Sequence, residues 1–67
     1  MRSAEKYFEW FRAEAEKLSN DIKFEILDII AHFNERNIYI ELDRLHNEGK
    51  IPDSWRKKLD EYCEYVW

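Results

Sequence analysis

Glycine and proline, which interrupt helices and form turns, occur only once each in this chain, at Gly49 and Pro52. Apolar residues make up 45% of the 67 positions and aromatic residues 16%, which is too much apolar bulk for a disordered chain. Turn-forming residues are too few for the many turns of an all-β fold. The composition therefore predicts an all-α fold, with residues 1–67 forming a single helical domain.

The small size of the chain limits how it can be stabilised. A domain of this length buries only about 60% of the surface that its unfolded chain exposes. Cys63 is the only cysteine, so no disulfide can form within one chain. A lone thiol without a signal peptide is typical of a reducing cytosol, and no apolar run approaches the roughly 20 residues of a membrane-spanning helix. We therefore expect a soluble, cytoplasmic protein.

Apolar residues at three- and four-residue steps predict a helix near each end of the chain. The first helix is expected from an N-cap at Ser3 to about Lys17 or Leu18, with an apolar stripe of Ala4, Tyr7, Phe8, Phe11, Ala15 and Leu18. The last helix is expected to begin at Pro52 or after an Asp53 cap, and its inward stripe is Trp55, Leu59, Tyr62 and Val66. Trp10 and Trp67 fall outside these two stripes.

The segment 20–35 predicts a second helix that is apolar on two nearly opposite faces. One face carries Ile22, Ile26, Ile29, Ile30 and Phe33, and the other carries Phe24, Leu27 and Ala31. Only a narrow strip is polar, formed by Glu25, Asp28, His32 and Glu35. Because a helix that is apolar most of the way round is buried on most sides, we expect a small bundle of three to four short helices packed around a central second helix.

The segment 37–48 allows two interpretations. Ile38, Tyr39 and Ile40 have strand propensity, so residues 37–42 can be read as a strand. A helix is favoured because Ile38, Leu42 and Leu45 share one helical face, with Asn37 as a possible cap and Gly49 just after the helix end. A single strand would also have no partner elsewhere in the sequence.

Few residues suggest chemistry. Asp28 and His32 are one turn apart on a helix and can share a metal ion, but no second ligand pair and no zinc-type spacing accompany them. No glycine-rich phosphate loop is present, and Cys63 reads as a small buried apolar residue. We therefore expect neither an enzyme nor a metal or cofactor site.

Charge and exposed aromatic residues favour a role in binding proteins. Fifteen acidic residues outnumber eleven basic ones, giving a net charge of −4. The sequence predicts an adaptor, inhibitor or regulatory subunit that binds another protein and forms a homodimer through the second apolar face of residues 20–35. Tryptophan and tyrosine are enriched at binding hot spots, and the interface candidates are Trp10, Phe24, Tyr39, Ile40 and Trp67.

Nucleic-acid binding is the alternative function. It would use a dimeric helical regulator and the only basic run of the chain, Arg56, Lys57 and Lys58. The expected recognition helix carries Glu41 and Asp43, whose charges would be repelled by phosphates.

The alternative interpretation for Trp10 and Trp67 is that they complete the core.

Overall fold

The computed structural model describes residues 4–67, which fold into four α-helices and one turn of 3-10 helix. The helices are α1 (Glu5–Ala15), α2 (Asn20–His32), α3 (Glu35–Asn47), η1 (Asp53–Trp55) and α4 (Arg56–Val66). The all-α prediction is confirmed, and residues 37–42 are helical, with no strand among residues 4–67. The first helix ends at Ala15, two or three residues earlier than expected, and the proposed Ser3 cap lies outside the described residues.

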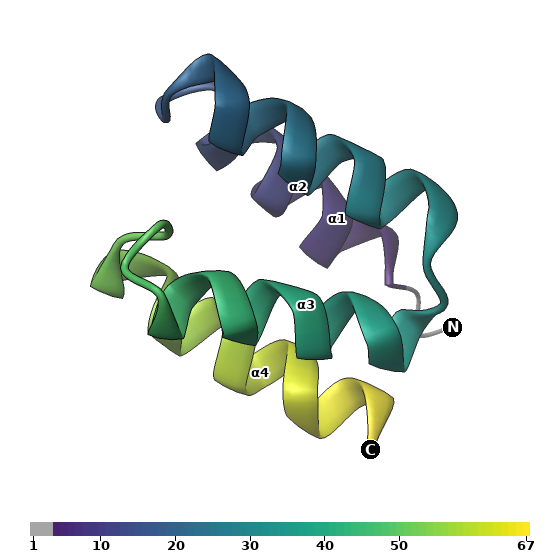
Figure 1. The fold of residues 1–67 in the computed structure, drawn as a ribbon. Coiled ribbons are helices and arrows are strands. Elements are labelled where there is room, and N and C mark those ends of the chain that lie inside the picture. Colours follow the sequence, from purple (N-terminus) through teal and green to yellow (C-terminus); the bar gives the residue numbers. More distant parts are fainter. Residues whose placement is uncertain (1–3) are drawn as a thin grey trace.

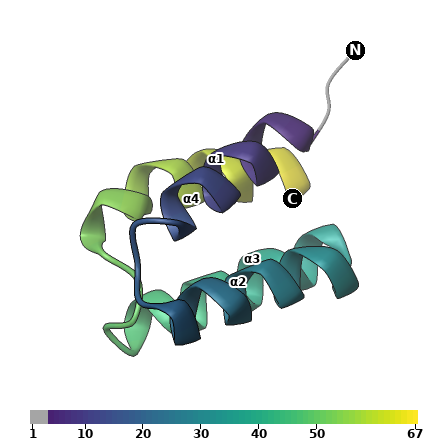
Figure 2. The same ribbon diagram turned by 90° about the horizontal axis from the view of Figure 1, so that it is seen from above.

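The helices are arranged as two hairpins that pack against each other. α1 and α2 form one hairpin, and α3 and α4 form the other, with α2 beside α3 (Figure 1). Figure 2 shows the same bundle as two layers, with α1 and α4 in one layer and α2 and α3 in the other. The first and last helices of the chain therefore meet in space.

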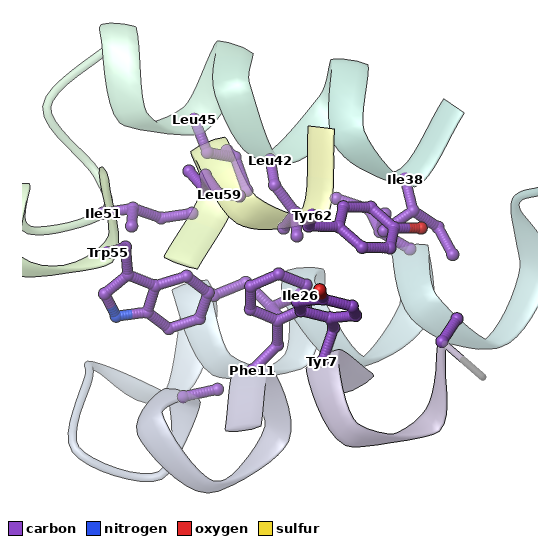
Figure 3. Close-up of a cluster of buried hydrophobic side chains, with 13 residues drawn as sticks. Tyr7, Phe11, Ile26, Ile38, Leu42, Leu45, Ile51, Trp55, Leu59 and Tyr62 are labelled. Atoms are coloured by element: carbon purple, nitrogen blue, oxygen red, sulfur yellow. The ribbon is translucent and has the colours of Figure 1, made fainter. Parts of the chain in front are cut away.

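An aromatic cluster joins α1 to α4 at the centre of the core (Figure 3). The Phe11 ring is stacked on the Trp55 ring, with 5.5 Å between centroids, and meets the Tyr62 ring edge-on at 5.6 Å. The centroids of the Tyr7 and Tyr62 rings lie 5.4 Å apart. Buried aliphatic residues of α2, α3, α4 and the loop before η1 complete the same core: Ile26, Ile29, Ile38, Leu42, Leu45, Ile51 and Leu59.

The two apolar faces of the second helix predicted that it lies at the centre of the bundle. This prediction is wrong, because α2 lies at the periphery. α2 buries only Ile26 and Ile29 fully, while Phe24 is 61% exposed. The reason is geometric: within residues 4–67, α2 packs closely against only two of the other helices, α1 and α3, because α4 lies against α3. Phe33, which was placed on the inward face, ends α2 and is also exposed.

Local signals account for the ends of α3. Asn34, rather than the expected Asn37, caps its start, because the Asn34 side chain accepts a hydrogen bond of 2.9 Å from the Asn37 backbone N–H. At its end the Lys50 N–H donates to the Leu45 carbonyl, and Gly49 has a φ of +79°. This is the Schellman arrangement, in which glycine is favoured because it adopts positive φ without strain.

The start of the last helix also differs from the expectation. Pro52 precedes the 3-10 turn in an extended conformation, and no side chain caps that turn. The Asp53 carboxylate instead lies 2.9 Å from the His46 imidazole and ties the turn to α3. The inward residues Trp55, Leu59 and Tyr62 are buried as expected, and Val66 is partly buried.

A buried hydrogen bond ties α4 to the start of α3. The Tyr62 hydroxyl donates to the Glu35 carbonyl at 2.7 Å. Burial, and secondarily the negative charge of Glu35, raise the pKa of Tyr62 well above its ordinary value. The neutral phenol is thus the form that the folded protein favours.

Phe11→Ala and Phe24→Ala remove the same atoms from a buried and an exposed position. We expect Phe11→Ala to lower the free energy of unfolding by about 3–5 kcal/mol, as for other buried aromatic truncations. Phe24→Ala should change it by less than about 0.5 kcal/mol, as is usual for surface positions. Urea unfolding followed by circular dichroism measures both, and equal losses would contradict the core described above.

Alkaline pH should destabilise the protein partly through Tyr62. Above about pH 10 the unfolded chain loses tyrosine protons, whereas folded Tyr62 keeps its own because its pKa is raised. The contribution of this residue is therefore complete below that pH and is lost as the pH rises further. Tyr62→Phe should cost about 1 kcal/mol at pH 8 but reduce the additional loss between pH 8 and 11, as measured by urea unfolding. An unchanged alkaline loss would contradict the assignment.

Candidate functional site

Trp10 lies at the margin of the core. Its ring meets Trp55 edge-on at 5.3 Å, and the Lys58 ammonium lies 5.6 Å from its centroid. The side chain is partly buried and packs against the buried cluster. Contacts within the chain therefore account for Trp10, although periodicity placed it off the α1 stripe.

Trp67 is exposed but held in place by α3. It is 61% exposed, and its ring meets Tyr39 edge-on at 5.5 Å. The Arg36 guanidinium lies 5.5 Å from the Trp67 centroid and donates a hydrogen bond of 3.1 Å to the Val66 carbonyl. Tyr39 itself is partly buried. The structure therefore brings the interface candidates Tyr39 and Trp67 together on one edge of the α3–α4 hairpin.

Helix α2 carries exposed apolar residues on the face that points away from the core. Phe24, Leu27 and Ala31 project from the helix face opposite Ile26 and Ile29, and we call these three residues the outer stripe. Phe24 and Ala31 are exposed and Leu27 is partly buried. Among residues 4–67, the helices that pack closely against α2 are α1 and α3. Ile40, 48% exposed, lies on the neighbouring helix α3.

Ion pairs surround the outer stripe unevenly. Lys23, whose ammonium lies 5.0 Å from the Phe24 ring centroid, is paired with Glu16 at 3.5 Å. Arg44 is shared by three carboxylates, at 3.5 Å from Glu25, 2.9 Å from Glu41 and 3.1 Å from Glu48. The surface formed by α2 and α3 is therefore acidic.

Two of the three residues of the basic run, Arg56 and Lys58, form ion pairs with acidic neighbours. Arg56 is 2.9 Å from Asp43 and 3.0 Å from Asp60, and the hydrogen bond to Asp43 raises the pKa of Arg56. Lys58 is 3.5 Å from Glu61. Paired cations contribute little to the phosphate contacts that dominate nucleic-acid affinity.

Lys57 and Lys58 share a shallow hollow of about 250 Å³ with Trp10, Ser54 and Glu61. The structure thus joins one protein-interface candidate to two nucleic-acid candidates, a proximity that their sequence separation did not indicate. The walls carry two positive charges and one negative charge, and the hollow is open to solvent.

The residues considered for chemistry do not converge. His32 and Asp28 form an exposed pair at 3.4 Å. Within residues 4–67 no group of three or more histidine, cysteine or carboxylate side chains is placed to hold a metal ion. Cys63 is a partly buried free thiol. Over the same residues no helix is long and apolar enough to cross a membrane.

Comparison of the chain with protein-family models, curated proteins and solved structures yields no match. The surface of the molecule, and above all the outer stripe, is therefore the guide to its function.

The three tryptophans should differ in their access to solvent. Trp55 is 1% exposed, Trp10 is partly buried and Trp67 is largely exposed. We expect Trp67→Phe to remove most of the fluorescence that acrylamide quenches readily, and Trp10→Phe to remove a smaller part. Circular dichroism confirms that each variant is folded. If Trp10→Phe removes the larger part, Trp10 is more exposed than described here.

Proposed function

We propose that this chain is a protein-binding module whose contact surface centres on the outer stripe of α2. The observation that carries the proposal is the exposure of Phe24, at 61%, on the same helix face as Leu27 and Ala31. These positions follow the i, i+3, i+7 spacing through which helices present apolar anchors to a partner.

Energetics support this reading of the stripe. Burying a side chain the size of phenylalanine or leucine stabilises a complex by about 1.5–3 kcal/mol. Phe24 and Leu27 are not needed to complete the core, whose buried residues form one cluster without them. A partner that covers the stripe therefore gains this energy without unfolding the bundle.

The proposal assigns binding rather than catalysis to the protein, as an adaptor, inhibitor or regulatory subunit in a reducing, cytoplasmic setting. The single free thiol, Cys63, supports that setting. A homodimer through the outer stripe is one form of this activity, and solution mass distinguishes it from binding to a different protein.

Site-specific cross-linking tests the proposal. A photoreactive residue replacing Ala31 should yield discrete protein adducts in cells, and the same residue replacing Lys57 on α4 should not, because only position 31 lies on the stripe. Phe24→Glu in the Ala31 cross-linker background should remove most of each adduct by placing a charge in the apolar contact.

Mass spectrometry of the adducts identifies a second copy or another protein, and sedimentation equilibrium of the free chain measures self-association. Equal adducts from positions 31 and 57, or adducts that persist with Phe24→Glu, would reject the outer stripe as the contact surface.

A further inference from the structure

The outer stripe has an acidic edge. Asp21 and Asp28 lie three residues before and four residues after Phe24, so at 100° per residue both project within about 60° of it, on the same side. Both side chains are exposed, that of Asp28 by 70%. A segment that covers Phe24 would therefore pass close to both carboxylates.

The cations near this edge are already engaged. Lys23 is balanced by Glu16 at 3.5 Å, and Arg44 is shared among Glu25, Glu41 and Glu48. His32 lies 3.4 Å from Asp28 and carries a full positive charge only when it is protonated. The carboxylates in and around this edge outnumber the neighbouring cations, so the edge keeps a net negative charge.

A second copy fits this edge poorly. In an antiparallel pair of α2 helices related by a two-fold axis, the acidic edges of the two copies lie along each other. A parallel pair brings the acidic edge against Lys23, which is already paired with Glu16. Like charges placed opposite each other weaken an association, whereas complementary charges favour it.

We infer that the outer stripe binds a cationic amphipathic helix, in which apolar residues spaced for one helix face are flanked by lysine or arginine. The apolar face of the partner covers Phe24 and Leu27, and its cations lie beside Asp21 and Asp28. The inference rests on the proposed function, and it adds the chemistry of the partner to it.

Two synthetic helical peptides test the charge requirement. They share one apolar stripe and differ only in its flanks, which are lysine in one and glutamate in the other. Fluorescence anisotropy should show that the lysine peptide binds the protein at least about tenfold more tightly than the glutamate peptide, a difference of about 1.4 kcal/mol. Added salt should weaken the lysine complex, because it screens exposed charges.

Two variants with equal changes in net charge locate the effect. Asp21→Asn with Asp28→Asn should weaken binding of the lysine peptide by about tenfold. Glu61→Gln with Glu64→Gln, which removes two exposed carboxylates from α4, should leave it within about twofold. Equal losses in the two variants would show nonspecific attraction to an acidic protein and would overturn the inference.

The stripe itself is tested with Phe24→Ser. If the lysine and glutamate peptides bind equally well and Phe24→Ser abolishes the binding of both, the inference of a cationic partner is wrong, and the outer stripe remains the proposed contact surface. If Phe24→Ser changes neither binding nor the cross-links from position 31, the proposed function fails as well. A dimer at micromolar concentration that Phe24→Ser dissociates would identify a second copy as the occupant and overturn the cationic partner. Thermal unfolding of every variant confirms that the bundle remains folded.

Discussion

The contact of Phe11 with Trp55 and Tyr62 holds the two ends of the chain together. These rings belong to α1, η1 and α4, and their centroids lie 5.5 and 5.6 Å from that of Phe11. Aromatic pairs at such distances add about 0.5–1.5 kcal/mol each beyond the burial of their area. A domain of this size has a small core, so the loss of this contact would remove a substantial part of it.

That closure explains why α2 keeps an uncovered face. All four α-helices and η1 contribute buried residues to the centre, and α2 contributes only Ile26 and Ile29. Four short helices meeting around one cluster leave each helix an outer side. On α3 that side carries the half-exposed Ile40, and on α2 it carries Phe24, which is 61% exposed. The candidate site is therefore a consequence of how the small core is shared.

Periodicity predicted the all-α fold, the inward stripes of α1 and α4, and the helix over residues 37–42, because these depend on residues close in sequence. It did not predict that Trp10 packs on Trp55, since contact between α1 and η1 depends on tertiary closure. The two apolar faces of α2 were recognised, but their burial depends on the number of neighbouring helices. Phe24 was a sequence candidate, whereas Asp21 and Asp28 were not considered as one edge of a binding surface, because that depends on which face of α2 the other helices leave exposed.

The division into two hairpins also has a kinetic meaning. Successive helices are joined by short connections, whereas the seam of Phe11 with Trp55 and Tyr62 joins residues near opposite ends of the chain. Proteins dominated by such local contacts fold rapidly, because little loop entropy is lost before contacts form. We expect each hairpin to collapse early and the meeting of Phe11 with Trp55 to complete folding. A transient opening of the molecule into its two hairpins would have to separate both α1 from α4 and α2 from α3.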